Sequence, residues 1–238
     1  MMKRFYTMVS SKKTDEGYAL ELDGKTVNTP SGQVIVAPTK ALIDAVIAEW
    51  SAQEDKVKPE TMPLTQILTT AIDKKRDRQA ITESLMRYLN TDLVCYWAKD
   101  PEDIAAKQKE IWGGWCKWFE DHFEVSLYTT KNIDAIEQEE ETHKRVWNYI
   151  ESLDDYYFSV LHIVTSLGGS LVLGLAFTEG DIDPQQLFEA SYLEELHRGE
   201  IYNEELHGVS PEEEKERDNF KRDADAARQF IDLANDYG

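Results

Sequence analysis

The first forty residues alternate apolar and polar positions with the period of two that half-buried β-strands show. The sequence GYALELD, which starts at residue 17, places Tyr18, Leu20 and Leu22 on one face. Asp23-Gly24 directly afterwards suits a tight hairpin turn. The sequence PSG marks a second turn before the apolar stretch QVIVAP. Together with the stretch RFYTMVSS near the start, these features predict a small antiparallel meander.

After Pro38 the apolar period becomes that of an amphipathic helix. Thr39 is a suitable N-cap for this helix, because its hydroxyl can accept a bond from a first-turn amide. Leu42, Val46 and Trp50 fall on one of its faces. Beyond a loop that contains two prolines, four more stretches have helix length and an apolar stripe: LTQILTTAID, ITESLMRYLNTDLVCYWA, DIAAKQKEIWGGWCKWFEDHF and EQEEETHKRVWNYIESL.

These patterns predict an α+β protein in which a small β-rich amino-terminal domain precedes a larger all-helical domain. We expect residues 1–75 to form the first domain, together with its first helix, and residues 76–238 to form the second. The chain has 238 residues, of which 41% are hydrophobic, so it can bury a core without metals or disulfides.

One apolar run, Tyr156 to Phe177, contains no charged residue and is long enough to cross a bilayer. It also contains His162, several hydroxyl side chains and three glycines, and Asp and Glu flank it in place of the usual Lys and Arg anchors. The centre of a helical bundle also requires a segment that is apolar all round. We therefore expect a buried bundle helix and no membrane insertion.

Charge narrows the class of partner. The formal net charge of −20 would repel nucleic acid and anionic lipid, which leaves a basic or apolar protein surface as the better partner. The amino-terminal sequence MMKRFYTMV lacks the features of a secretion signal or of an organelle transit sequence. We expect a bacterial cytoplasmic protein, or a mitochondrial matrix protein whose presequence has been removed.

The sequence NTDLVCYW, residues 90–97, places an acid and a thiol three residues apart within a predicted helix. A cysteine nucleophile requires an adjacent base and an accessible, electropositive setting. Cys95 is surrounded by apolar residues, and Cys116 lies in a second aromatic segment with no paired spacing. We therefore expect two buried structural thiols, and an Asp92 carboxylate whose burial requires hydrogen-bond donors at a bend.

A di-metal carboxylate enzyme is the alternative that the residues suggest. The motif Glu-x-x-His occurs three times, ending at His143, His197 and His207, and two such motifs with two further glutamates can build a di-metal site. However, His197 and His207 are too close in sequence to come from two facing helices. These regions are also so rich in Glu that chance produces the spacing. We favour solvated helix faces and expect no cofactor and no bound metal.

Several strings occur in the order in which one family has them: RFY from Arg4, LDGKTVNTP from Leu22, EWSAQ from Glu49, MPLT from Met62, TAID from Thr70, TDLVCY from Thr91 and SLVLGLAF from Ser170. From Arg4 to Glu205 the chain resembles the ATP synthase assembly chaperones that act on the alpha subunit of the F-type catalytic head, the mitochondrial complex assembly factor 2 family. The resemblance implies a non-enzymatic protein. Family members bind unassembled alpha subunit, prevent its aggregation and release it to the beta subunit.

The resemblance also implies the fold predicted above, and it suggests partner-binding residues. The family has a carboxy-terminal Trp-Gly-Glu-Asp motif, which here corresponds to Tyr202, Asn203, Glu204 and Glu205. It usually has Arg after the Cys-Tyr pair, where this chain has Trp97. We therefore take Tyr202, Glu204, Glu205 and Trp97 as the candidate partner-binding residues.

Overall fold

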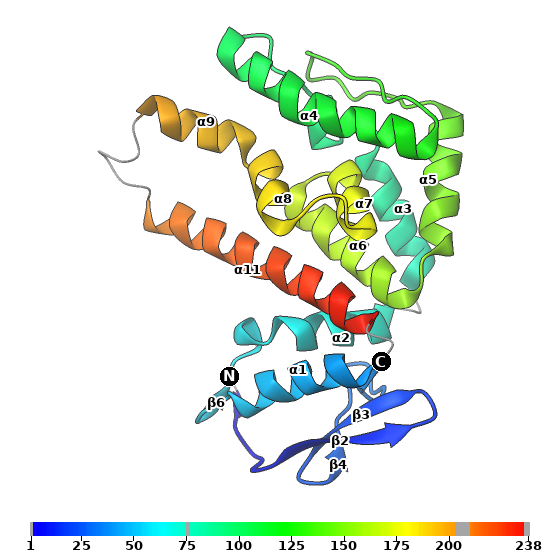
Figure 1. The fold of residues 1–238 in the computed structure, drawn as a ribbon, viewed down its shortest axis with the longest axis vertical. Helices are drawn as coiled ribbons and strands as arrows, with labels where there is room; N and C mark the ends of the chain where they lie inside the picture. Colours follow the sequence, from blue (N-terminus) through cyan, green and yellow to red (C-terminus); the bar gives the residue numbers. More distant parts are fainter. Residues whose placement is uncertain (1, 75–76, 203–209, 236–238) are drawn as a thin grey trace. The chain divides into compact units, whose positions relative to one another are not determined.

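The computed structural model describes residues 2–74, 77–202 and 210–235 (Figure 1). The chain forms two compact units. The first, which we call the mixed unit, comprises Met1–Arg78, Asp154–Val160 and Ala226–Gly238. The second, the helical unit, comprises Gln79–Leu153 and Leu161–Asp225. The architecture is α+β with the strands at the amino-terminal end, as the hydrophobic pattern predicted.

The strands of the mixed unit form an antiparallel sheet centred on β3 (Gly17–Leu22). β3 pairs with β2 (Val9–Thr14) in full register, and with the short strands β4 (Lys25–Thr26) and β5 (Val36–Ala37). A separate two-stranded sheet joins β1 (Met2–Lys3) to β6 (Lys56–Val57). The predicted antiparallel sheet is therefore confirmed, but it is not a simple meander, because β5 pairs with β3 and not with β4.

Positive backbone φ angles mark the tight turns of this sheet. The predicted hairpin turn has φ values of 49° at Asp23 and 76° at Gly24, as a two-residue turn of this type requires. Gly17 has φ of 136°, and a Cβ atom there would lie 2.2 Å from the carbonyl oxygen of Ala37. The close approach of β3 to the chain at Ala37 therefore requires glycine at position 17.

Helix α1 (Lys40–Ser51) lies against β2 and β3. It begins as the sequence predicted, because the Thr39 hydroxyl accepts a hydrogen bond of 3.1 Å from the amide of Leu42. Leu42, Val46 and Trp50 are buried on its inner face.

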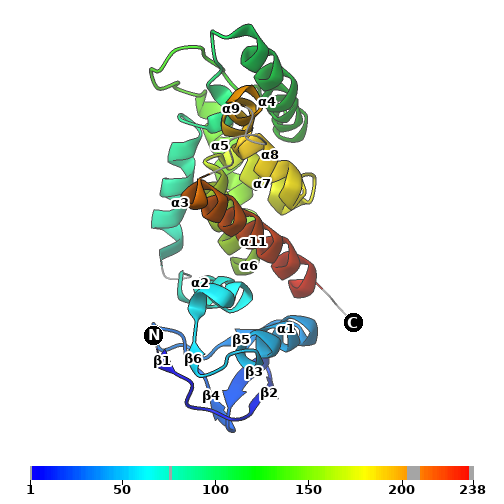
Figure 2. The same cartoon turned by 90° about the vertical axis from the view of Figure 1, so that its left-hand side faces the viewer.

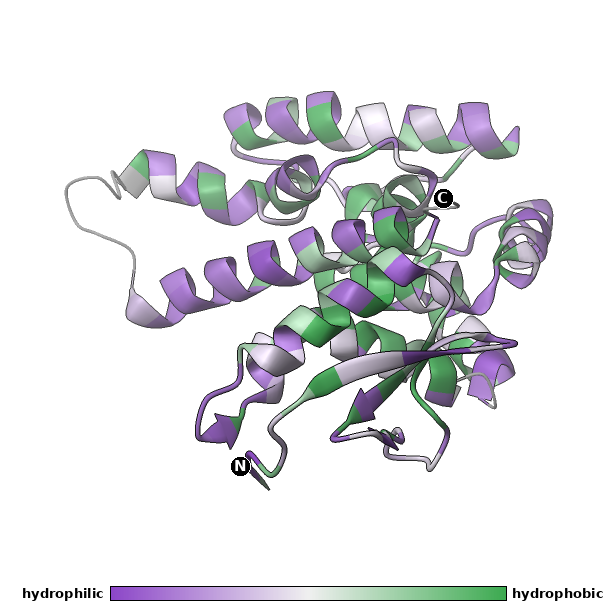
Figure 3. Ribbon diagram, turned by 60° about the horizontal axis from the view of Figure 1, so that its bottom comes forward, coloured by the Kyte–Doolittle hydropathy of each residue, from purple (hydrophilic) through white to green (hydrophobic). Residues whose placement is uncertain are grey.

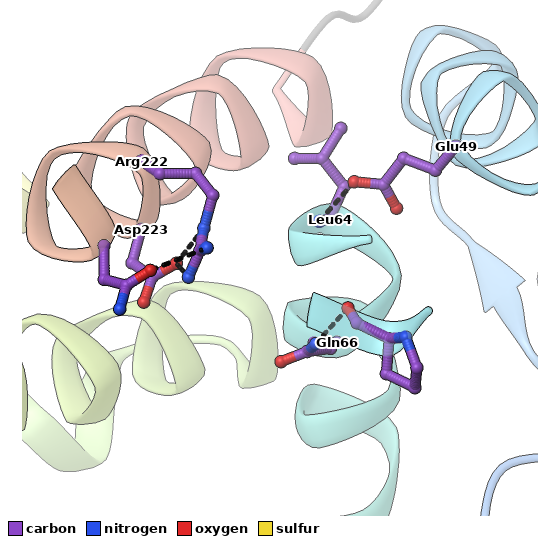
Figure 4. Close-up of polar contacts among 7 residues, drawn as sticks. Glu49, Leu64, Gln66, Arg222 and Asp223 are labelled. Carbon is purple, nitrogen blue, oxygen red and sulfur yellow. Dashed lines mark hydrogen bonds and ion pairs between the residues drawn. The ribbon is translucent and has the colours of Figure 1, made fainter. Parts of the chain in front are cut away.

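Helix α2 (Pro63–Lys74) follows the short 3-10 helix η1 (Pro59–Thr61). Glu49 of α1 contacts the start of α2 (Figure 4). Its two carboxylate oxygens accept hydrogen bonds of 2.8 Å from the amides of Leu64 and Thr65. These amides lack partners within the helix, so the carboxylate satisfies them. Burial nevertheless raises the pKa of Glu49 above its ordinary value. Figure 4 also shows the side chain of Gln66, which donates to the carbonyl of Pro59.

In its described residues, the helical unit contains helices of 8 to 24 residues, some shared with the mixed unit, and one 3-10 turn. They are α3 (Arg78–Tyr88), η3 (Leu93–Cys95), α4 (Glu102–Phe123), α5 (Glu140–Ser152), α6 (Asp155–Gly168), α7 (Leu171–Glu179), α8 (Pro184–Ser191), α9 (Leu193–Tyr202) and α11 (Pro211–Ala234). Helices α6 and α11 contribute residues to both units. Figure 3 shows that α11 is hydrophilic in its first turns and more hydrophobic towards its end.

The long apolar run forms two helices, α6 and α7, in place of one. Gly169, with φ of 66°, ends the first segment, and the Ser170 hydroxyl caps α7 by accepting from the amide of Leu173 at 3.0 Å. Leu171 to Thr178 are all buried, which explains why this helix lacks a polar face. Among the described residues, no helix combines the length and the apolar character needed to cross a membrane.

The single helix predicted over ITESLMRYLNTDLVCYWA is wrong. Helix α3 ends at Tyr88, and the chain then runs through a turn into η3. Asp92 has an extended backbone, with φ of −66° and ψ of 130°, and its side chain accepts from the amide of Val94. Short polar side chains such as those of Asn90 to Asp92 compete for backbone groups, and this competition ends the helix.

Candidate partner-binding surface

Asp92 holds the NTDLVCYW segment against the start of α7. Its buried carboxylate accepts hydrogen bonds from the Ser170 hydroxyl at 2.5 Å, the amide of Val172 at 3.0 Å and the amide of Val94 at 3.2 Å. Desolvation raises its pKa to about 6, although these donors act in the opposite direction. The expectation that a buried Asp92 would be satisfied at a bend is confirmed.

The two cysteines lie together, which their sequence spacing did not indicate. The Cys116 thiol donates to the carbonyl of Val94 at 3.6 Å, and the Gln138 amide group lies 3.9 Å from the sulfur of Cys95. The pKa of Cys95 is raised far above its usual value, mainly by a hydrogen bond with Cys116 and secondly by burial. A thiol with a raised pKa yields little thiolate, so its environment fits a structural role and not a nucleophile.

Trp97 is half-buried and is held by the segments around it. Its indole nitrogen donates to the carbonyl of Val94 at 2.8 Å, and its amide donates to the carbonyl of Thr130 at 2.8 Å. The ring edge lies over Gly113 of α4, where an added Cβ atom would be 3.6 Å from it. These contacts give Trp97 a role in packing, and its role in partner binding stays a prediction.

The other candidate partner-binding residues follow α9. Tyr202 is the last residue of α9, whereas Glu204 and Glu205 lie outside the described residues, so their role also stays a prediction. Helix α9 itself is attached to α4 within the helical unit (Figures 1 and 2). Gln108 of α4 donates to Glu194 at 2.7 Å, and Lys107 forms an ion pair with Glu200. The ion pair lowers the pKa of Glu200.

The Glu-x-x-His motifs lie in separate surroundings. His143 is 3.1 Å from the side-chain oxygen of Asn90, and His197 is buried 3.1 Å from the carboxylate of Asp103. The third motif, at residues 204–207, lies outside the described residues. Within the described part of the chain, no three His, Cys, Asp or Glu side chains are grouped in a way that could hold a metal ion.

Helix α4 carries a row of apolar and aromatic side chains that the fold leaves partly exposed. Ile111, Trp115, Trp118 and His122 are four, three and four residues apart, so they lie on one side of the helix. None of them is fully buried. The Trp118 ring stacks on His122 with centroids 5.0 Å apart, and its indole nitrogen donates to Asp181 at 2.9 Å. We call these four residues the aromatic face of α4.

A hollow of about 390 Å³ adjoins the aromatic face. It is lined by Ile111, Gly114 and Trp115 of α4 and by Gln186 and Glu189 of α8. An added Cβ atom at Gly114 would have nothing within 4 Å, so the hollow is open above this glycine. The spacing of the aromatic residues was visible in the sequence, but which helix faces are covered depends on non-local packing.

The negative charge is concentrated in the same part of the chain. Residues 1–78 contain 12 Lys and Arg against 11 Asp and Glu, and residues 79–238 contain 14 against 35. The first stretch is therefore close to neutral, and the second carries the entire net negative charge. A partner with basic groups would be attracted to the second stretch.

The first half of the chain matches the model of a known protein family. Residues 3–120, about half of the chain, match the family described as ATP12 chaperone protein. The mitochondrial atp12 protein of Schizosaccharomyces pombe is 24% identical over 205 residues, which cover 81% of this chain and 70% of that protein. The mitochondrial ATP12 protein of Saccharomyces cerevisiae is 30% identical over 111 residues, which cover 38% of this chain and 34% of that protein.

Solved structures extend the match over nearly the whole chain. Atp12 from Paracoccus denitrificans superimposes with a TM-score of 0.87 at 28% identity, covering 98% of this chain and 99% of that one. A point mutant of the same protein gives the same score. The Atu1473 protein from Agrobacterium tumefaciens has a TM-score of 0.85 at 30% identity, covering 97% of this chain and 85% of that one.

Proposed function

Because the chain belongs to the ATP12 chaperone family, whose members are ATP synthase assembly chaperones and not enzymes, we propose that it binds the unassembled alpha subunit of the F-type catalytic head. It prevents the aggregation of this client and releases it to the beta subunit. The motifs from Arg4 to Glu205 support this choice of client, since they resemble the chaperones that act on alpha.

The observation that carries the proposal is the aromatic face of α4. Partly buried Trp side chains offer a large apolar area at a small cost in conformational entropy, and Trp is over-represented among residues that dominate binding energy. In this chain Trp115 and Trp118 lie beside an open hollow, where a client side chain can fit. An unassembled subunit exposes the apolar surface meant for its neighbour, and this face supplies a complementary one.

Such a chaperone acts by mass action. A protein that covers the exposed surface lowers the free concentration of the aggregating species, to an extent set by its concentration relative to the dissociation constant. The beta subunit then displaces the chaperone by binding the same client surface more favourably. Moderate affinity is sufficient for this exchange, and no nucleotide needs to be hydrolysed by the chaperone.

The acidic helical residues contribute to encounter and orientation. The net charge of residues 79–238, with 14 basic against 35 acidic side chains, attracts a basic client surface over a distance set by the Debye length. The acidic residues Glu204 and Glu205 belong to this stretch, and we propose that they and Tyr202 contact the client. We place the encounter in the bacterial cytoplasm, or in the mitochondrial matrix for a eukaryotic protein.

Co-expression with the cognate alpha subunit tests the proposal. We expect alpha to become soluble, to elute with this protein in gel filtration, and to leave the complex when beta subunit is added. Co-expression with beta alone is the matched control and should give no complex. If alpha is equally soluble without this protein, or elutes separately from it, the proposed client is wrong.

A further inference from the structure

The loop between α4 and α5, residues 124–139, carries the most exposed large apolar side chain among the described residues. Ile133 is 100% exposed, and the tip around it, residues 131–135, is exposed throughout. Tyr128, on the same loop, is 50% exposed. Figures 1 and 2 show the loop projecting beside α4 within the helical unit.

One side of the loop is paired with the NTDLVCYW segment as a short parallel bridge. The amide of Thr130 donates to the carbonyl of Cys95 at 2.8 Å, and the amide of Trp97 donates to the carbonyl of Thr130 at 2.8 Å. Nearer the tip, the Lys99 ammonium group donates to the side chain of Asn132 at 2.9 Å. The loop is therefore held three residues before Ile133, at Thr130, and again one residue before it, at Asn132.

The other side is fixed by a buried glutamine. Gln138 is only 3% exposed, and its amide group bonds both backbone groups of Tyr128, at 2.9 and 3.0 Å. Its own backbone amide donates to the side chain of Asn90 at 3.1 Å, and the amide of Ile136 donates to the carbonyl of Asn90 at 3.2 Å. The two ends of the loop are thus joined to each other and to residues 90–97.

A single exposed apolar residue is common on protein surfaces and needs no explanation by itself. The unusual feature here is that an Ile with no intramolecular contact sits on a loop held by hydrogen bonds on both sides. Ordering a loop reduces its conformational entropy before any partner arrives, so less free energy is lost on binding. This arrangement fits an anchor side chain that is presented to a partner.

We propose that Ile133 is an anchor that inserts into an apolar pocket of the client subunit, a pocket bordered by basic side chains. The composition of the loop supports a basic border around the pocket. The loop contains four carboxylates and a single cation, Lys131, and α5 begins with Glu140 and Glu141. The same carboxylates disfavour an anionic lipid surface. The inference rests on the proposed chaperone function and adds a second contact to the aromatic face of α4.

Three variants of the full chain test the anchor, with the affinity for unassembled alpha subunit and the melting temperature as readouts. Ile133→Asp and Ile133→Thr should each raise the dissociation constant about tenfold or more, as loss of an interface hot spot does. Asn132→Asp is the matched control, because it adds the same charge one residue away and keeps an acceptor for Lys99. It should change the dissociation constant by less than about threefold on the same scale.

All three variants should melt like the wild-type protein, since position 133 makes no contact that folding depends on. If the Ile133 variants bind alpha as the wild type does, the anchor is refuted while the chaperone function stands. Equal weakening by Ile133→Asp and Asn132→Asp, with none by Ile133→Thr, would also refute it, because charge alone would explain the loss. If the wild-type protein does not bind alpha, the proposed function fails and the anchor fails with it.

A photo-crosslinking amino acid at position 133 identifies the occupant directly. The expected product is a covalent adduct with the alpha subunit in a mixture that also contains vesicles of anionic phospholipid. An adduct only with lipid, or only with a second copy of this chain, would overturn the proposal.

Discussion

At the scale of single residues, the unusual groups of this chain lie inside the fold and not at a reactive centre. Asp92 and Cys95 both have raised pKa values. In an enzyme such shifts can mark a functional group, but they also arise wherever a polar side chain is buried for structural reasons. Here the partners of Asp92 are the Ser170 hydroxyl and backbone amides, and these contacts explain why a carboxylate is buried at this position without any substrate.

The pKa of Asp92, about 6 in the folded protein against an ordinary 3.8, makes stability depend on pH. Between about pH 4 and pH 6 the folded protein keeps this proton while the unfolded chain loses it. The contribution of Asp92 to the free energy of unfolding is therefore fully present below about pH 4. It falls by about 1.4 kcal/mol per pH unit through this window and is constant above about pH 7.

The test measures the free energy of unfolding of the wild type and of Asp92→Asn as a function of pH. The difference, wild type minus variant, should decrease with rising pH as described, because the variant does not titrate at this position. The carbon NMR signal of the Asp92 carboxyl group gives a second readout that needs no variant. Its midpoint should lie near pH 6. A midpoint near 3.8 would contradict the burial of this carboxylate.

Cys95→Ala should lower the free energy of unfolding by about 1 kcal/mol, the usual scale for loss of a small buried group. The side chain is 0% exposed, so its loss leaves a small void and removes contacts in the helical unit. Chemical denaturation measures this change in the free energy of unfolding. Capture of alpha subunit by the variant should equal that by the wild type. Loss of capture at an unaltered unfolding midpoint would instead make Cys95 a functional residue.

At the scale of elements, local signals were predictable and distant ones were not. The Thr39 cap, the Asp23-Gly24 turn and the inner face of α1 depend on residues a few positions apart, and the structure confirms all three. The path of the chain after α3 is held by Asp92, whose partner Ser170 is 78 residues away. No period in the sequence reveals such a partner, and the apolar stripe that continues past the polar residues 90–92 led to the prediction of one long helix.

The same limit applies to the candidate site. The resemblance pointed to Trp97, Tyr202, Glu204 and Glu205. The exposed aromatic face of α4 and the fully exposed Ile133 could be found only from the packed structure. Apolar spacing shows that residues share a face, but not whether another helix covers it. From spacing alone, Trp115 and Trp118 could equally have been core residues, as Trp112 of the same helix is.

Helix α4 provides a test of element stability at the edge of the hollow. Gly114→Ala should stabilise the protein by about 0.5 to 1 kcal/mol, because Ala has a higher helix propensity and the new methyl group meets nothing within 4 Å. Gly17→Ala is the contrasting variant. Its Cβ atom would lie 2.2 Å from the carbonyl oxygen of Ala37, so it should destabilise strongly. The melting temperatures of both variants, compared with that of the wild type, test these two expectations. Stabilisation by Gly17→Ala would contradict the strand packing described.

At the scale of the whole molecule, charge and exposed apolar area occur in the same stretch of sequence. Residues 79–238 carry 35 acidic against 14 basic side chains, and they include the aromatic face of α4 and the 124–139 loop. Apolar contacts supply most of the affinity of a protein interface, while complementary charge increases the association rate and selects the partner. This combination suits the proposed role, in which the protein captures one subunit quickly and later releases it.

The central claim is that the aromatic face of α4 binds the client. The most direct test compares the affinity of two purified proteins for unassembled alpha subunit, the wild type and the double variant Ile111→Ser with Trp115→Ser. Both side chains line the hollow and are only half-buried, so the variant should keep its fold. We predict that its dissociation constant rises at least about thirtyfold, equal to about 2 kcal/mol, with a far-UV circular dichroism spectrum like that of wild type. Equal affinity of the two proteins for alpha would contradict the account.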